Sequence, residues 1–345
     1  MNKLTKPLLA YTFSHFCVDF ACFFVLFGVF KVSQNSLQNV SIGFLTYNVI
    51  AFGLQPIIGK ICDDNPRIPI GIIGCFIVLL GLFASGFPWI SLLICAFGNA
   101  SFHIGGGIDN LRFAKGKIAR SGIFVSSGAL GVFLGTIVGN GNKALVYLPV
   151  TIIVASIILI ALFAVKYEDG DVCDISIASD FPYATVLVLI FVSIMIRSYV
   201  GGIIPMDWKT ASFVFLPATS AFFGKALGGI LGDKYGAKNI GVTALMLSIP
   251  FLYFGKNIAL LSAIGIVLFN ITMPITLSVV ASKLPYNPGL AFGLTTLALL
   301  CGNIPSFFIK VPEILVFLLL LVLIVISSIC VLLSTKNNIN GDEVL

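Results

Sequence analysis

Long apolar runs fill most of this chain, and short polar segments separate them. A continuous apolar run of about 20 residues is long enough to cross a lipid bilayer as a helix. This pattern predicts an all-α polytopic membrane protein. Its twelve transmembrane helices are expected at residues 8–30, 38–58, 68–86, 88–109, 120–141, 144–166, 181–205, 210–231, 236–255, 257–281, 287–309 and 313–334.

The composition supports this prediction. Of the 345 residues, 58% are hydrophobic and 10% are charged, and the mean hydropathy is +1.09. Soluble domains carry about 25% charged residues, so a soluble enzyme and a nucleic-acid-binding module are both excluded. No ATP-binding G-x-x-x-x-G-K-[ST] motif occurs. The eight cysteines are scattered without a C-x-x-C pair, so we expect no metal and no cofactor.

The basic residues orient the chain in its membrane. With the N-terminus inside, the cytoplasmic side receives fourteen lysines and arginines, Lys225 among them, and the outside receives five. Arg197 is left within a predicted helix. Cytoplasmic loops of membrane proteins carry this excess of positive charge. We therefore expect a multi-pass protein of the inner (plasma) membrane with both termini in the cytoplasm.

Two similar halves are indicated by one long polar stretch and by an internal repeat. The acidic stretch near the middle of the chain separates six predicted helices from six, so we expect halves at residues 1–166 and 181–345, joined by a cytoplasmic linker at 167–180. The loop motif ending at Asp63 recurs 170 residues later at Asp233. Parallel repeats of this size are a feature of many transporters.

The two repeated loops carry a family signature. Residues 229–238 resemble the G-x-x-x-D-[RK]-x-G-x-[RK] motif of the major facilitator superfamily, whereas the first copy departs from it at Asp64 and Pro66. The resemblance implies two six-helix halves that expose a central site alternately to each side. A carboxylate in such a loop can pair with basic residues or helix ends of the other half, or it can simply belong to a tight charged turn. The candidate gating residues are Asp63, Arg67, Asp109, Asp233, Lys234 and Lys238.

Ionisable side chains deep in a membrane helix are costly and mark functional sites. They fall on the first, fourth and seventh predicted helices, which line the central cavity in the family that the loops resemble. His15 and Asp19 are one turn apart and share a helix face. At 1.5 Å per residue, His103 lies at a depth comparable to that of His15, so we expect the two rings to face one another. We predict proton coupling by His15, Asp19 and His103; a structural hydrogen-bonded pair is the alternative.

Arg197 needs a counter-charge inside the membrane. Asp19 across the cavity could supply it, and so could an anionic substrate; the sequence leaves both open. Tyr47, Gln55 and Asn270 are further candidates for binding substrate, although each could instead satisfy a neighbouring helix.

Three segments resemble the fosmidomycin-resistance branch of the superfamily: Ser14–Asp19, Gly98–His103 and Ile196–Ser198, with Ile104 where that branch has proline. This resemblance implies proton-driven export. We therefore expect a secondary active transporter of a small organic solute, not an enzyme, energised by a proton gradient and monomeric in the lipid bilayer. The alternatives are a polytopic membrane enzyme, such as an acyltransferase with an intramembrane histidine base, and a non-transporting membrane sensor.

Overall fold

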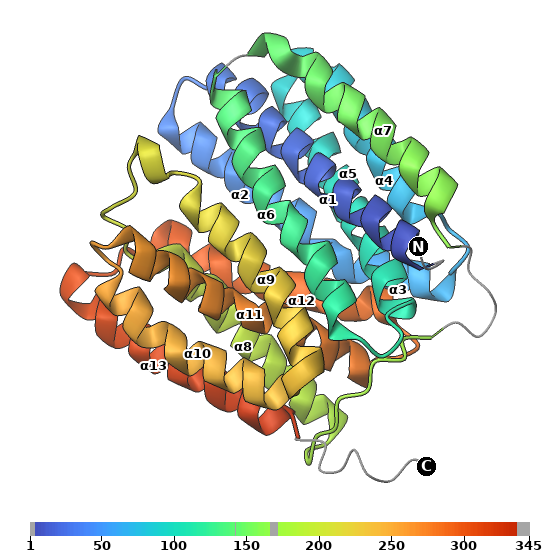
Figure 1. The fold of residues 1–345 in the computed structure, drawn as a ribbon. Coiled ribbons are helices and arrows are strands. Elements are labelled where there is room, and N and C mark those ends of the chain that lie inside the picture. The colour runs from blue at the N-terminus through green and yellow to red at the C-terminus, as the bar shows by residue number, and fades with distance from the viewer. Residues whose placement is uncertain (1–3, 142, 166–171, 337–345) are drawn as a thin grey trace.

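The computed structural model describes residues 4–141, 143–165 and 172–336, and in these ranges every regular element is helical (Figure 1). The first bundle contains α1 (Thr5–Phe24), η1 (Val25–Lys31), α2 (Leu37–Gly53), α3 (Gln55–Asp64), α4 (Ile70–Phe83), η2 (Ala84–Gly86), α5 (Pro88–Arg112), α6 (Ile118–Gly141), η3 (Lys143–Val146) and α7 (Tyr147–Phe163). The second contains α8 (Tyr183–Ile203), η4 (Ala211–Phe213), α9 (Leu216–Tyr235), α10 (Ala237–Phe254), α11 (Ala259–Lys283), α12 (Pro288–Phe308) and α13 (Glu313–Ser334).

The predicted membrane helices coincide with these elements. Helix α1 runs on through the π-helical turns of η1, and α2 bends at Leu54, just before Pro56, into α3. Nine helical segments in the described part of the chain are long and apolar enough to cross a membrane. Two shorter apolar segments, Ile70–Gly86 and Tyr147–Phe163, fall below that length, and the more polar α9 is not among the nine. The all-helical membrane fold is thus confirmed, while the count of twelve spans stays a prediction.

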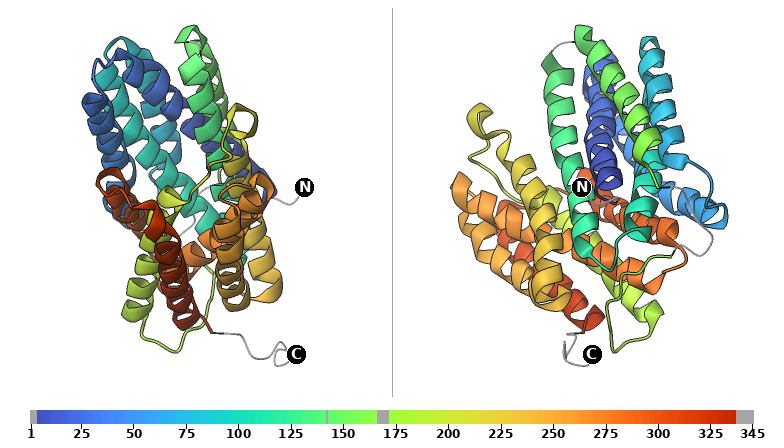
Figure 2. Two further views of the ribbon diagram at one scale, coloured as in Figure 1. Left: turned by 90° about the vertical axis from the view of Figure 1, so that its left-hand side faces the viewer. Right: turned by 45° about the vertical axis from the view of Figure 1, so that its right-hand side comes forward.

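The helices gather into two bundles, blue to green and yellow to red in Figure 1, and Figure 2 shows them inclined to each other. They meet mainly where α6 packs on α9 and where α3 packs on α12. Glycine allows both crossings to be close. A Cβ added to Gly229 on α9 would lie 2.7 Å from the Cα of Ala119 on α6, and one added to Gly59 on α3 would overlap the carbonyl of Gly289 on α12. Whether the two bundles move as separate units stays a prediction.

The predicted linker is described only in part, since residues 167–171 lie outside the described residues. From 172 to 180 the chain is extended and rests on the second bundle. The N–H of Cys173 donates to the carbonyl of Pro285, and the Lys283 ammonium donates to that of Ile177. Burial raises the pKa of the Cys173 thiol to about 11. We therefore expect this thiol to be unreactive at neutral pH, because the thiolate is the nucleophile.

Candidate functional site

A cavity of about 700 Å³ lies between the two bundles. Of the predicted site residues, it is lined by His15, Asp19, Tyr47, His103, Arg197 and Asn270. Five helices supply these six side chains, which are far apart in sequence: α1, α2, α5, α8 and α11. The sequence expectation that the intramembrane histidines, Asp19 and Arg197 share one central cavity therefore agrees with the geometry, while their roles stay predictions.

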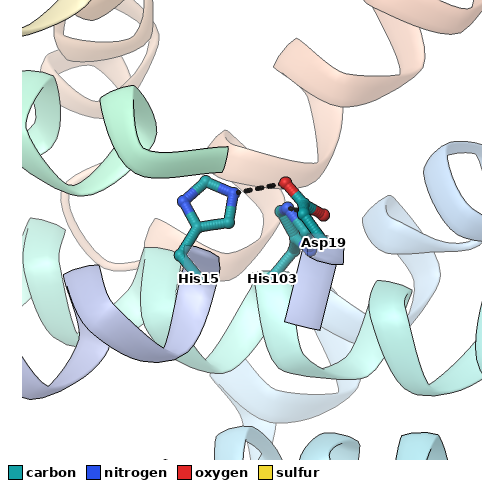
Figure 3. Close-up of side chains that lie close together, drawn as sticks. All are labelled: His15, Asp19 and His103. Atoms are coloured by element: carbon teal, nitrogen blue, oxygen red, sulfur yellow. Dashed lines mark ion pairs between the residues drawn. The ribbon is translucent and has the colours of Figure 1, made fainter. Parts of the chain in front are cut away.

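Three of these side chains form a compact buried cluster. Figure 3 shows His15, Asp19 and His103 pointing toward one another. Asp19 Oδ2 lies 3.3 Å from His15 Nε2, and Asp19 Oδ1 lies 3.7 Å from His103 Nε2. The two imidazole rings meet edge to face with their centroids 4.6 Å apart. The predicted facing of the two histidines is thus present in the structure, with the carboxylate between them.

Backbone carbonyls fix which histidine nitrogen carries hydrogen. His15 Nδ1 lies 2.8 Å from the carbonyl oxygen of Phe124, and His103 Nδ1 lies 2.9 Å from that of Asn99. A carbonyl can only accept, so each Nδ1 must be the protonated nitrogen of a neutral ring. Each Nε2 then directs a lone pair at the carboxylate. A proton on either Nε2 turns that unfavourable contact into an ion pair, so the cluster is built to take up a positive charge.

Asn99, on α5, was not predicted as part of the site. Its amide nitrogen donates to Asp19 Oδ1 at 3.0 Å, and its own carbonyl holds His103. One residue thus orients both a carboxylate and an imidazole. Its position four residues before His103 was the available signal, because residues at that spacing lie on one helix face.

The same cluster contains the atoms that could hold a metal ion. The ligand atoms of His15, Asp19 and His103 lie within 4.8 Å of one another and are buried. Metal-bound histidines commonly donate their second ring nitrogen to a carbonyl, as both rings do here. No metal-ligand motif marks this cluster in the sequence, because its residues lie 4 and 84 positions apart along the chain.

Gly128 on α6 lets the cluster pack against that helix. A Cβ added there would lie 2.6 Å from His15 Nε2 and would overlap the Asp19 carboxylate. Gly128→Ala should therefore push the two side chains apart and destabilise the protein by about 1–3 kcal/mol. The melting temperature of the purified protein measures this. The matched control on the same helix is Gly141→Ala, where a Cβ meets nothing within 4 Å; equal effects of the two substitutions would contradict the packing argument.

Arg197 does not pair with Asp19. Its side chain is buried, with 6% exposed, and its Nε and Nη1 atoms have no hydrogen-bond partner. Among the described residues, no carboxylate forms an ion pair with it. Asp19 is bonded by Asn99 and faces the two histidines instead, so the second alternative from the sequence, an anionic ligand, stays a prediction.

Lys225 corrects the charge assignment made from the sequence. The count placed it on the cytoplasmic side, but its side chain lines the cavity in the middle of α9. Counting by nearest loop misplaces a lysine that projects from a membrane helix toward a polar interior. The signal was its position well inside the predicted helix 210–231, where a charge is functional by default.

Gln55 is the substrate-binding candidate that does not line the cavity. It is fully buried where α2 bends into α3, and its amide donates to the carbonyl of Ala51. Asn270 lines the cavity and likewise bonds one turn back, to Ile266. The hydroxyl of Tyr47 is buried without a partner, which leaves it able to bond a ligand.

The two predicted loop carboxylates cap helices of the opposite bundle. Asp63 accepts the N–H groups of Gly289 and Leu290 at 2.9 and 2.8 Å, at the start of α12. Asp233 accepts those of Ile118 and Ala119 at 2.7 and 3.0 Å, at the start of α6. A carboxylate at a helix N-terminus meets unpaired donors and the positive end of the helix dipole. The two contacts are equivalent positions of the sequence repeat and tie the bundles together at one end.

The other gating candidates lie elsewhere. Arg67 and Asp109 line a second cavity of about 460 Å³ formed by the first bundle. Lys234 places its ammonium 5.0 Å from the ring centroid of Tyr235, and Lys238 lies at the start of α10. None of these four residues takes part in the cap hydrogen bonds of Asp63 and Asp233, and their gating role stays a prediction.

Comparison with known proteins places the fold. No protein-family profile and no curated protein sequence matches the chain. Solved structures do. FucP, a major facilitator superfamily transporter in the outward conformation, superposes with a TM-score of 0.68 at 11% identity, covering 97% of this chain and all of FucP. A variant of the E. coli fucose:proton symporter gives 0.70 at 13% identity, with the same coverage.

A bacterial homologue of the iron transporter ferroportin in the outward-facing state gives a TM-score of 0.60 at 15% identity, covering 97% of this chain and 98% of that one. Identities this low establish shared architecture rather than shared substrate or mechanism. On this likeness, and on its two helical bundles around a central cavity, the chain has the fold of the major facilitator superfamily transporters.

Proposed function

We propose that this protein is a secondary active transporter that moves a small organic solute by alternating access and is driven by protons. One observation carries the proposal: a buried His15–Asp19–His103 cluster, poised to take up a positive charge, lies on the wall of the central cavity between the bundles. A fucose:proton symporter and an iron-transporter homologue share the fold, which supports transport as the general function.

The shape of the cavity supports alternating access. Its lining includes Met206 and Lys209 in the connection from α8 to α9, which the charge pattern assigns to the outside. It includes no residue of the last turns of α3 and α9, which carry Asp63 and Asp233. The structure on this account is outward-facing, with its cytoplasmic end closed by the two capped helix ends. Inward opening then requires both carboxylates to leave α6 and α12.

The cluster provides a physical route to coupling. An unprotonated Asp19 facing two lone pairs is an uncompensated negative charge in the cavity wall, and such a charge is costly in a site closed from water. A proton on His15 or His103 neutralises the cluster, so the closed intermediate between the two open states forms more readily when the proton is bound. The cluster lies on α1 and α5 of the first bundle, next to α6, whose N-terminus Asp233 caps.

Export is the direction that we propose, because Ser14–Asp19, Gly98–His103 and Ile196–Ser198 resemble the fosmidomycin-resistance branch. The membrane is the bacterial-type plasma membrane, with both termini in the cytoplasm, as the basic residues indicate.

Reconstituted vesicles test the proposal. The purified chain in liposomes receives an imposed pH gradient and a panel of small organic acids, sugars and antibiotics. We expect at least one solute to move against its concentration gradient, and that movement to stop when a protonophore collapses the pH gradient. No movement of any panel solute, or movement indifferent to the protonophore, would contradict the proposal.

A further inference from the structure

The charges that line the central cavity are unbalanced. In the described part of the chain, its wall contains three cations, Arg197, Lys209 and Lys225, and a single carboxylate, Asp19. That carboxylate is already bonded by Asn99 and faces two histidines in the first bundle. All three cations belong to α8, α9 or the connection between them, so the wall supplied by the second bundle is electropositive.

Arg197 is the most buried of the three cations. Its side chain is more than nine-tenths buried, yet Nε and Nη1 lack any acceptor. A buried guanidinium without hydrogen-bond partners is costly unless something else supplies oxygen atoms. Ser198, the next residue, donates its hydroxyl to the carbonyl of Leu299, and its oxygen accepts no hydrogen bond from Nε or Nη1 of the guanidinium. Because Arg197 lines the cavity, a ligand in the cavity can supply the missing partner.

Lys225 adds a second positive charge to the same cavity wall. It projects from the middle of α9 into the cavity that Arg197 also lines. Two cations that repel one another in a cavity wall are stabilised together by one anion between them. The planar fork of arginine suits two oxygens of one carboxylate or phosphoryl group, while lysine serves as a point charge.

From these contacts we propose that the transported solute is a small organic anion, whose oxyanion is bound by Arg197 and Lys225. This inference rests on the proposed transport function and names the class of its substrate. The anion then sits on the second bundle and the proton on the first, at opposite walls of one cavity. Lys209 lies on the same wall in the α8–α9 connection, toward the proposed outer end, where it favours the approach of an anion. The apolar part of the lining, which includes Phe23, Phe52 and Phe269, suits a carbon skeleton.

Binding of matched probes tests the charge requirement. The full-length protein in detergent is heated with lactate, glutarate, benzoate or methylphosphonate, and in parallel with lactamide, glutaramide, benzamide or dimethyl methylphosphonate. We expect at least one anion to raise the melting temperature in a dose-dependent way, and its neutral counterpart to have no effect. A response to carboxylates alone, to the phosphonate alone or to both identifies the oxyanion; equal protection by the neutral partners, or no protection by any anion, overturns the proposal.

Substitutions locate the anion. Arg197→Gln should weaken the binding of the active probe about tenfold to a hundredfold, and Lys225→Gln should weaken it about tenfold. Lys310→Gln removes an exposed charge in the connection from α12 to α13. It is the matched control and should bind as the wild type does. Unchanged affinity in Arg197→Gln overturns the assignment.

The ligand-free melting temperature separates a binding residue from a structural one. An arginine that binds a ligand and has no protein partner does not stabilise the ligand-free protein. Arg197→Met removes an unpaired buried charge, so this variant should melt no lower than the wild type. A structural arginine would give a lower melting temperature in this variant.

The inference and the proposed function fail in distinguishable ways. Anion binding that depends on Arg197, without any proton-driven flux in vesicles, would sink the transport function and leave the anion site standing. Proton-driven flux of a neutral solute that persists in Arg197→Gln would overturn the anion site and leave the transport function standing.

Discussion

Asp19→Asn should abolish the accumulation of solute driven by a pH gradient while it leaves solute exchange between the two sides of the membrane intact. The carboxylate is the only negative charge among the described residues that line the cavity, and both histidine Nε2 atoms face it. An amide of the same size retains the packing but does not attract a proton to the imidazoles. The charge-assisted bonds lost are each worth about 1.5–3 kcal/mol, so we expect net accumulation to fall by at least about tenfold.

The measurement compares accumulation and counterflow of one panel solute in the same vesicles. Wild-type accumulation should rise with the size of the imposed pH gradient, and accumulation by Asp19→Asn should not respond to the gradient. Asp174→Asn removes an exposed carboxylate in the linker and should behave as the wild type does. Full proton-driven accumulation in Asp19→Asn would rule out the cluster as the coupling site.

Removing both capping carboxylates, in the double variant Asp63→Ala and Asp233→Ala, should open the cytoplasmic end of the protein. Each carboxylate accepts two backbone N–H groups at a helix start of the opposite bundle. Helix caps are worth about 0.5–2 kcal/mol each, so loss of both should shift the ratio of inward-open to outward-open molecules by at least about fivefold. The single variants should each give roughly half of this free-energy change, because the two sites lie on different helix pairs.

Distance distributions between spin labels measure this shift. Labels at Asn65→Cys and Tyr286→Cys, both exposed loop positions on opposite bundles, report the separation of the bundles at that end. The background replaces the native cysteines. Asp64→Asn, which breaks an ion pair within one helix, should leave the distribution unchanged. A double variant with the same short distance as the wild type would show that other contacts hold the bundles closed.

The sequence predicted the helices well, since apolar runs of membrane length leave little freedom in where a span lies. It also predicted that His15 and Asp19 share a face, because their spacing is one helical turn, and it placed His103 at matching depth. The sequence repeat identified Asp63 and Asp233 as equivalent carboxylates, but it left open whether they pair with basic residues or with helix ends. The sequence motif names the carboxylates, but their partners are backbone N–H groups, which any residue supplies.

Other features of the site depend on how the helices pack and could not be read from the chain. The backbone carbonyls of Phe124 and Asn99 set the histidine tautomers, and no pattern of side chains along the chain predicts where a backbone carbonyl lies. Gln55 lies outside the cavity, at the bend between α2 and α3, although the sequence predicted one helix over 38–58. Lys225 was assigned to a loop because the charge count ignored depth. In each of these cases the missing information was the direction of a side chain within its helix.

Proton movement coupled to solute is the measurement that tests the account most directly. Vesicles containing the wild-type protein and a trapped pH indicator receive, on one side, the organic anion that stabilises the protein. The account predicts an immediate change of internal pH that is absent in empty vesicles and in Asp19→Asn. Solute movement without any change of pH, or the same pH change in Asp19→Asn, would contradict it.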